Sequence, residues 1–170
     1  MTVADISMAE TPEDIEAVKQ LCRDFVSWLL ETFPEQHDKI QTYFEPVKWE
    51  KTLAGLQDMH ARPKGGMLLA RVDDVPVGCI MYHELSPGVA EVKRLFVSTE
   101  ARGMGVASRL VEALMDSARA DGYRELCLDT TKFLRAAEQL YRKHGFVDSS
   151  HTIDLPPESL EVVVFLRRAL

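Results

Sequence analysis

Val89-Ala-Glu-Val-Lys-Arg-Leu-Phe-Val-Ser98 leads into Arg102-Gly-Met-Gly-Val-Ala107, and this stretch decides the fold. The first run is typical of a β-strand, and the second places two glycines at the start of an amphipathic helix. The first N–H groups of a helix have no partner within it and lie at the positive end of its dipole. Glycine also lets an anion approach the main chain closely. The stretch therefore predicts a strand, an anion-binding turn and a helix.

The composition indicates one globular domain over residues 1–170, with 46% hydrophobic and 28% charged residues. The net charge of −7 argues against a nucleic-acid-binding protein. An acidic surface favours cationic substrates such as amines, or serves only solubility. No apolar run approaches the roughly 20 residues that span a bilayer, and the acidic N-terminus does not resemble a secretory signal. We therefore expect a cytoplasmic protein with no nucleic-acid or membrane partner, and a homodimer is compatible with the sequence.

The cysteines and histidines predict no metal site. Cys22, Cys79 and Cys127 are widely spaced within apolar runs, which is typical of buried thiols in a reducing compartment. None of the five histidines lies at the spacing of a metal ligand.

The rest of the chain alternates helical and strand patterns. Thr11-Pro-Glu-Asp14 has the residues that start a helix, which we expect to end near Phe33-Pro34. Less regular helical residues follow over 35–56, with a break at Pro46. We expect strands at 67–72, 75–83, 89–98, 124–129, 146–149 and 162–166, and further helices at 107–118 and 133–144. Short turns imply antiparallel neighbours, whereas strand 89–98, helix and strand 124–129 form a parallel crossover.

Two common phosphate-binding motifs do not match. The chain has no Gly-x4-Gly-Lys-Ser/Thr run, so a P-loop is excluded. A dinucleotide fingerprint fails at its third glycine, where Ser108 stands, although Asp129 partly imitates the ribose-binding acid of that fold. Taken alone, Gly103-x-Gly105 can also serve only the turn.

Four segments together are more specific than the turn alone. They are Glu91–Val97, Arg102–Ala107, Asp121-Gly-Tyr123 and Ala137-Glu-Gln-Leu-Tyr-Arg-Lys-His-Gly-Phe146. In this order and spacing they resemble the GNAT superfamily of acyl-CoA-dependent N-acyltransferases, over roughly residues 66–168. Arg102-x-x-Gly-x-Ala107 matches the family's Arg/Gln-x-x-Gly-x-Gly/Ala coenzyme loop, and Ala137-x-x-Leu-Tyr-x-x-x-Gly-Phe146 matches its second signature.

This resemblance implies a mixed α/β (α+β) fold: a six- to seven-stranded, mostly antiparallel sheet with one parallel crossover and about four helices. It also implies acetyl-CoA as co-substrate, with the pyrophosphate on the amides of residues 102–107 and the pantetheine arm beside strand 89–98. Arg102 either adds a contact to phosphate or is a solvated turn residue. The implied coenzyme-binding residues are Leu95, Phe96, Val97, Arg102, Gly103, Met104, Gly105, Val106 and Ala107.

Two proton-transfer roles follow from the resemblance. Glu91 matches the family's glutamate base, which would deprotonate the amine directly or through a water; its alternative role is a cross-strand ion pair. By strand parity Glu91 shares a face with Lys93, Leu95 and Val97, unless a bulge changes the register. Tyr141 matches the general acid near the CoA sulfur. With Gly145 ending its helix, Tyr141 should also pack on Phe146 in a Schellman cap.

The chain departs from the family pattern at Leu134, where many members carry asparagine. The polar contact of that asparagine to the coenzyme is then either absent or supplied by another residue such as Thr130 or Thr131. Arg142 and Lys143 either reach the 3′-phosphate of CoA or form a solvated helix face. His83 and Glu84 are reserve candidates for the base.

The expected reaction is acetyl transfer to a small-molecule or protein amine in a ternary complex, with the thioester carbonyl polarised by a backbone N–H near Val97. The acceptor should bind between the helices of residues 20–60 and the loop near 150–160. The alternatives are a non-catalytic acyl-CoA sensor or partner-binding module on the same fold, and a nucleotide-binding enzyme.

Overall fold

Seven strands form one sheet in the order β1-β2-β3-β4-β5-β7-β6 in the computed structural model, which describes residues 2–150, 155 and 157–170. Every neighbouring pair is antiparallel except β4 and β5. The mostly antiparallel sheet with one parallel crossover is thus confirmed. The strands are β1 (Asp5–Met8), β2 (Gly66–Val72), β3 (Val75–Ser86), β4 (Val89–Val97), β5 (Glu125–Thr131), β6 (Val147–Asp148) and β7 (Val163–Ala169).

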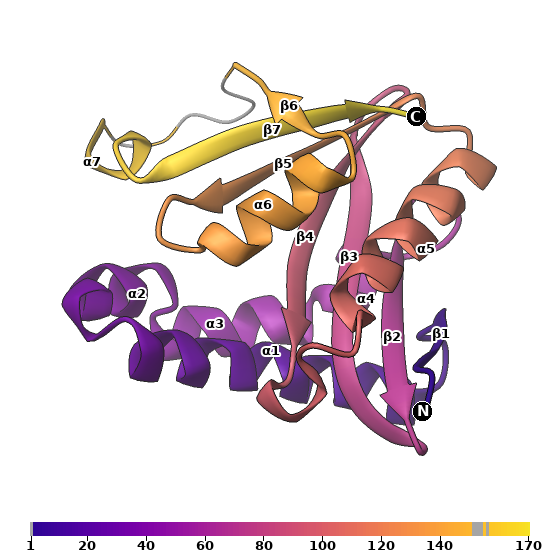
Figure 1. Cartoon of the computed structure of the whole chain (residues 1–170), viewed down its shortest axis with the longest axis horizontal. Helices are drawn as coiled ribbons and strands as arrows, with labels where there is room; N and C mark the ends of the chain where they lie inside the picture. Colours follow the sequence, from indigo (N-terminus) through magenta and orange to yellow (C-terminus); the bar gives the residue numbers. More distant parts are fainter. Residues whose placement is uncertain (1, 151–154, 156) are drawn as a thin grey trace.

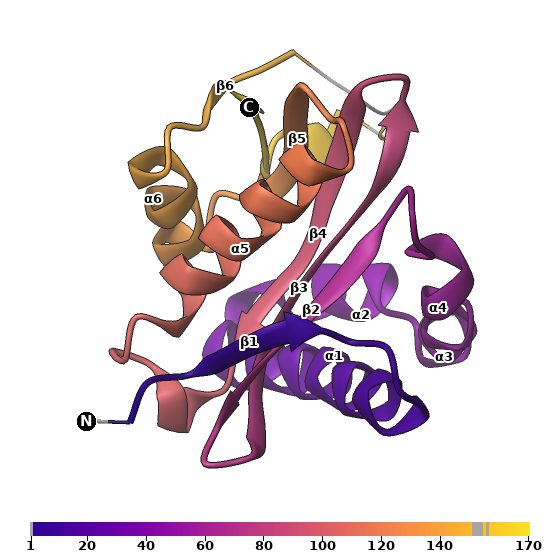
Figure 2. The same cartoon turned by 90° about the vertical axis from the view of Figure 1, so that its right-hand side faces the viewer.

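Helices cover both faces of the sheet, as Figure 2 shows from the side: α5 and α6 lie on one face and α1 to α4 on the other. The described residues contain more helices than the four expected, because the stretch 35–56 divides at Pro46 and again at Gly55 and because α7 was not predicted. The α-helices are α1 (Pro12–Thr32), α2 (His37–Tyr43), α3 (Pro46–Ala54), α4 (Leu56–Met59), α5 (Val106–Ala120), α6 (Arg135–Lys143) and α7 (Pro157–Leu160). Two short 3-10 helices are η1 (Pro34–Gln36) and η2 (Thr99–Ala101).

The predicted start of α1 is confirmed as a capping box. The Thr11 hydroxyl accepts from the Asp14 N–H, and the Asp14 carboxylate accepts from the Thr11 N–H, each at 3.1 Å. The same carboxylate pairs with Arg71 of β2, so the cap also fastens the helix to the sheet.

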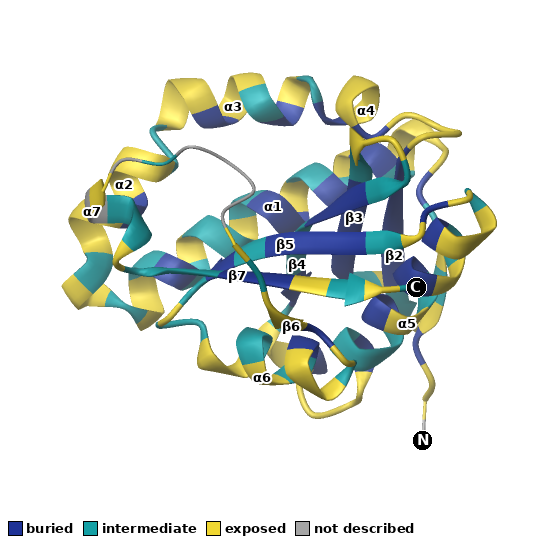
Figure 3. Ribbon diagram, turned by 90° about the horizontal axis from the view of Figure 1, so that it is seen from above, coloured by how far each residue is buried: buried dark blue, intermediate teal, exposed yellow. Residues whose placement is uncertain are grey.

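Two apolar cores lie on the two faces of the sheet. The core beneath α5 includes Val92, Val97, Leu110 and Leu114, and the core beneath α1 and α3 includes Val18, Leu53, Met81 and Phe96. Seen from above, the middle strands are almost wholly buried, whereas the outer surfaces of α2 and α3 are exposed (Figure 3). The centre of the sheet is therefore a rigid base for side chains that emerge from it.

A bulge in β4 changes which residues share a face. Cys79 of β3 pairs with Phe96 and Met81 pairs with Lys93, so two β4 residues oppose a single β3 residue between these pairs. Arg94 lies in the bulge with a φ of 59°. As a result Leu95 and Val97 face the α5 core, whereas Lys93 and Phe96 face the α1 core. The parity prediction excepted a bulge, and this bulge is why Leu95 and Val97 do not share a face with Glu91, whereas Lys93 does.

Candidate functional site

The strands β4 and β5 pair only at their beginnings. Parallel pairing joins Val89–Glu91 to Glu125–Cys127 and stops there, after which β5 continues beside β7 (Figure 1). Among the described residues, the main chain of β4 beyond Glu91 therefore has no strand on its β5 side. The Ser98 N–H donates to the Val77 carbonyl at 2.7 Å, and successive amides of a strand point in opposite directions. The Val97 N–H thus points away from β3, toward the opening.

The predicted anion-binding turn lies where β4 ends. Gly103 and Gly105 have φ values of 80° and 74°, and a Cβ at either position would meet no atom within 4 Å. Within the described part of the chain, six consecutive amides, Gly103–Ser108, donate to no backbone carbonyl. No side chain caps α5, and its first turn carries no acid. These N–H groups are free to bind an anion.

Arg102 has a position that neither expectation foresaw. Its guanidinium lies 4.2 Å from the centre of the Trp28 ring, and its Nε donates to the Val97 carbonyl at 3.3 Å. Arg102 thereby joins the turn to the end of β4 and to α1, and burial lowers its pKa. Phe96 contributes its side chain to the α1 core, so only its main chain borders the opening.

Glu91 lies at the point where β4 and β5 separate, and the residue is buried, with 3% of its surface exposed. Its Oε1 lies 2.9 Å from His83 Nε2 and accepts from Lys93 Nζ at 3.2 Å. The expected cross-strand pair with a lysine or arginine is therefore not the one formed, because Lys93 lies on the same strand and the partner on β3 is His83. Its Oε2 is buried and has no partner among the described residues. Burial raises the pKa of Glu91, but His83 and Lys93 together outweigh it and the net shift is downward. Glu91 is an anion with one unused acceptor oxygen.

His83 bridges Glu91 and the main chain of β3. Its Nδ1 lies 3.0 Å from the Glu84 carbonyl oxygen, and its Nε2 lies 2.9 Å from Glu91 Oε1. Glu84, the other reserve candidate, instead pairs with Lys64 at 2.9 Å.

Tyr141 lies on α6, and its predicted packing role is confirmed. The Phe146 N–H donates to the Tyr141 carbonyl and the Gly145 N–H to the Arg142 carbonyl, which is a Schellman motif. The rings of Tyr141 and Phe146 meet edge to face with centroids 5.3 Å apart. No hydrogen bond within the described chain uses the Tyr141 hydroxyl, and burial, followed by the charge of Asp129, raises its pKa. The phenol therefore keeps its proton at neutral pH.

Asp129 of β5 faces the same region, and sequence reasoning did not assign it there. Burial raises its pKa, although Lys93 acts in the opposite direction. Lys93 and Asp129 sit on different strands, so only the observed pairing reveals that they approach each other. Thr131 Oγ1 is buried without a partner in the described chain. Arg142 pairs with Glu138 and Asp148.

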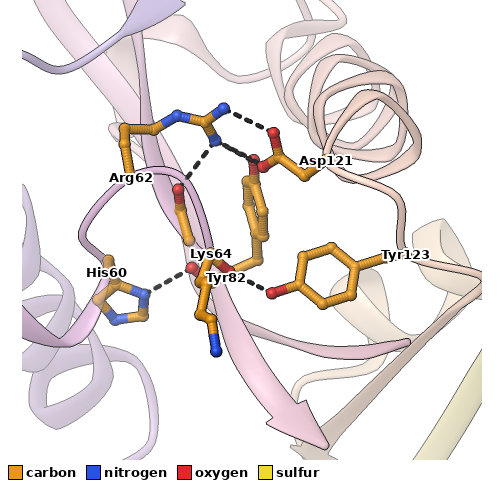
Figure 4. A network of polar contacts seen from close by, with 7 residues as sticks. His60, Arg62, Lys64, Tyr82, Asp121 and Tyr123 are labelled. Atoms are coloured by element: carbon orange, nitrogen blue, oxygen red, sulfur yellow. Dashed lines mark hydrogen bonds and ion pairs between the residues drawn. The ribbon is translucent and has the colours of Figure 1, made fainter. Parts of the chain in front are cut away.

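A polar network holds the segment before β2 against the sheet, as Figure 4 shows. Arg62 donates to both carboxylate oxygens of Asp121 at 2.6 Å, and the Tyr82 hydroxyl donates to Asp121 at 2.5 Å. His60 Nδ1 contacts the Tyr82 carbonyl at 2.9 Å, and burial lowers its pKa to about 4. The neutral His60 ring packs edge to face on His83 with centroids 5.4 Å apart. The network therefore fixes one wall beside the His83–Glu91 pair.

A cavity of about 430 Å³ lies beside this network and includes His83 and Lys64 in its lining. Among the described residues no group of three potential ligand side chains is arranged to hold a metal. No helix in the same part of the chain is long and apolar enough to cross a membrane. Residues 151–154 and 156 of the predicted acceptor loop near 150–160 lie outside the described residues.

Comparisons with known proteins agree with this geometry. The family model "Acetyltransferase (GNAT) family" matches residues 22–146. An uncharacterized N-acetyltransferase of Schizosaccharomyces pombe is 31% identical over 83% of this chain and 81% of its own length. An IAA acetyltransferase of Azospirillum brasilense is 34% identical over 78% of each chain. The PaiA N-acetyltransferase of Thermoplasma acidophilum, solved in complex with coenzyme A, superposes with a TM-score of 0.71 at 17% identity over 98% of this chain and 99% of its own.

Proposed function

Because the chain belongs to the acetyltransferase (GNAT) family and is an acyltransferase, we propose that it moves the acetyl group of acetyl-CoA to a primary amine by direct attack in a ternary complex. One observation carries the proposal. The free amides of Gly103–Ser108 adjoin the unpaired edge of β4, so a single ligand with a phosphate group and an extended amide arm would satisfy both.

The coenzyme would lie with its pyrophosphate on the amides of residues 102–107. Its pantetheine arm would run along Leu95–Val97 in the place that a neighbouring strand would take, with its amides bonding to the main chain. Arg102 would contribute charge beside the pyrophosphate from its position on Trp28. Thr131, with its unpartnered buried hydroxyl, would supply the polar contact that Leu134 lacks.

The reaction needs two proton transfers. The amine nitrogen attacks the thioester carbonyl carbon, the C–N bond forms, and the C–S bond then breaks to release CoA. Glu91 would accept the amine proton, directly or through a water, at its unused Oε2, and the Val97 N–H would stabilise the negative oxygen that develops on the carbonyl. Lys93 and His83 help to keep Glu91 ionised, so it is ready to act as a base at neutral pH.

Tyr141 would act on the departing sulfur. An ordinary thiol has a pKa of about 8.5, below that of a phenol, so full proton transfer in water would be uphill. Burial raises the pKa of the phenol further, so Tyr141 would act first as a hydrogen-bond donor that stabilises the developing thiolate. As general acid it would pass its proton to the sulfur only after the C–S bond has broken and where burial raises the pKa of the thiol as well.

The test is to incubate the protein with acetyl-CoA and a panel of primary amines, and to monitor turnover by the release of free thiol. We expect thiol release that depends on the amine, together with a thermal shift on addition of CoA. Binding of acetyl-CoA without turnover on any amine would favour the alternative, a non-catalytic acyl-CoA sensor. Stabilisation by NAD but not by CoA would favour a nucleotide-binding enzyme instead.

A further inference from the structure

Arg94 occupies the bulge of β4 in a backbone conformation that arginine rarely adopts. Its φ of 59° is in the left-handed region, which costs free energy for any residue with a Cβ. The guanidinium lies 4.6 Å from the centre of the Trp49 ring of α3. Strain of this kind persists where the surroundings enforce it, and it is concentrated at functional sites. The bulge therefore delivers a cation to the α1–α3 face, close to where the strands separate.

The Arg94 guanidinium has no acceptor. Other half-buried arginines each donate to a carboxylate or a carbonyl: they are Arg23, Arg71, Arg109 and Arg168. No side-chain hydrogen bond or ion pair engages Arg94 within the described part of the chain, and its Nε is buried without a partner. Trp49 Nε1, in the ring beneath it, is also buried without an acceptor. Buried donors normally find acceptors, so a ligand that carries acceptor oxygens would satisfy these two N–H groups.

Asp129 of β5 is near enough to act electrostatically with Arg94, but no hydrogen bond or ion pair joins the two side chains within the described residues. Glu91 is already in contact with His83 and Lys93 through its Oε1. The pyrophosphate of the coenzyme does not suit the place either, because its proposed cradle begins α5, on the opposite face of the sheet from Trp49. Lys93 is paired with Glu91, so Arg94 is the cation on the α1–α3 side of the site that no ion pair within the described residues engages. A second ammonium group on an acceptor would be repelled there, whereas an anionic group would be attracted.

We propose that Arg94 binds the carboxylate of the acceptor, so that the enzyme acetylates primary amines that carry a carboxylate, such as amino acids. This rests on the proposed function. The guanidinium fork matches the two oxygens of a carboxylate, and the ring of Trp49 holds the fork in place. The amine of the same molecule would then be directed toward Glu91, which lies three residues earlier on β4.

Matched acceptor pairs test the proposal. Each amino acid is compared with its own carboxamide, which keeps the amine and side chain but removes the negative charge. Loss of that charge also lowers the pKa of the amine, so the amide has more free amine and the comparison is biased against the proposal. For the wild-type chain we expect a kcat/KM about 10- to 100-fold higher for the carboxylate, mainly through KM. Amino acids whose amine lies at different distances from the carboxylate then show which distance between the two groups fits the site.

The substitution Arg94→Gln should abolish this preference while leaving kcat/KM for the amides within about threefold. Arg94→Lys keeps the positive charge but loses the two-pronged guanidinium, so it should retain part of the preference for carboxylates. It replaces Arg94→Gln as the test variant if the glutamine variant fails to fold. Arg119→Gln is the matched control, since Arg119 is an arginine near the C-terminal end of α5 that pairs with Asp116.

Three outcomes would overturn the proposal. Equal use of acids and amides by the wild-type chain would show that Arg94 only stacks on Trp49, and so would a preference that survives in Arg94→Gln. In both cases acetyl transfer itself would stand. Failure to acetylate any amine would overturn the proposed function as well, which separates the two failures.

Discussion

Replacing Glu91 with glutamine tests the proposed base with little change of shape. The variant removes the buried anion that accepts from His83 at 2.9 Å and from Lys93 at 3.2 Å, and it leaves Oε2 unable to take a proton. Because general-base catalysis contributes about 10²- to 10⁴-fold, we expect kcat to fall at least about 100-fold near neutral pH. The affinity for CoA should be unchanged, because the proposed coenzyme contacts lie beyond the bulge and in the turn after β4.

The pH dependence of that loss is more specific than its size. Without the base, turnover depends on amine that is already unprotonated, and this fraction rises about tenfold per pH unit below the amine pKa. The ratio of wild-type to variant rate should therefore be largest at low pH and shrink as pH rises. The assay is thiol release at saturating acceptor across this range. A loss below about threefold, or pH–rate profiles of the same shape, would remove Glu91 from the mechanism.

Stability provides a control for this variant, because Glu91 is also part of a buried ion pair. Loss of its two charge-assisted hydrogen bonds should lower the free energy of unfolding by about 2–3 kcal/mol at neutral pH. The pKa of Glu91 is lower in the folded chain than in the unfolded chain, so this stabilisation is present above the unfolded pKa and is lost as pH falls through the folded one. The urea midpoints of wild type and variant should converge in acid. Glu50→Gln, at an exposed pair with Arg23, should change stability and rate little.

Three further substitutions test other parts of the site. Tyr141→Phe should lower kcat about tenfold or more with CoA affinity unchanged, and full activity would leave Tyr141 with its packing role alone. Gly105→Arg places a side chain at a φ of 74° over the free amides, so calorimetry should detect no CoA binding; retained binding would contradict the pyrophosphate assignment. Arg62→Gln leaves the buried Asp121 carboxylate without its main partner, and urea unfolding should show a loss of about 2 kcal/mol, which an unchanged midpoint would refute.

Features that depend on neighbouring residues could be predicted from the sequence. The capping box of Thr11 and Asp14 and the Schellman motif at Gly145 each close within a few residues, so their geometry follows from local chemistry. The anion-binding turn is predictable for the same reason, since its two glycines and the helix that follows are contiguous. The order of strands around the crossover also followed from the lengths of the connections.

Features that depend on distant partners could not be predicted in this way. Strand β1 is only four residues long, and it forms because it pairs with β2 some sixty residues later. No glycine or asparagine marks the bulge at Arg94, so the change of face at Leu95 and Val97 has no local signal. Sequence parity did place Lys93 beside Glu91. It could not show that His83 contacts Glu91 across two strands, or that no hydrogen bond engages the Arg94 side chain within the described residues.

Transfer of a labelled acetyl group tests the central claim most directly. The chain is incubated with acetyl-CoA labelled in the acetyl group and with its best amine acceptor, and the products are identified by mass spectrometry. We predict label on the amine nitrogen, one CoA released for each amide formed, and no transfer by the Gly105→Arg variant. Label found only in free acetate, or acetyl-CoA that binds but never reacts, would contradict the account.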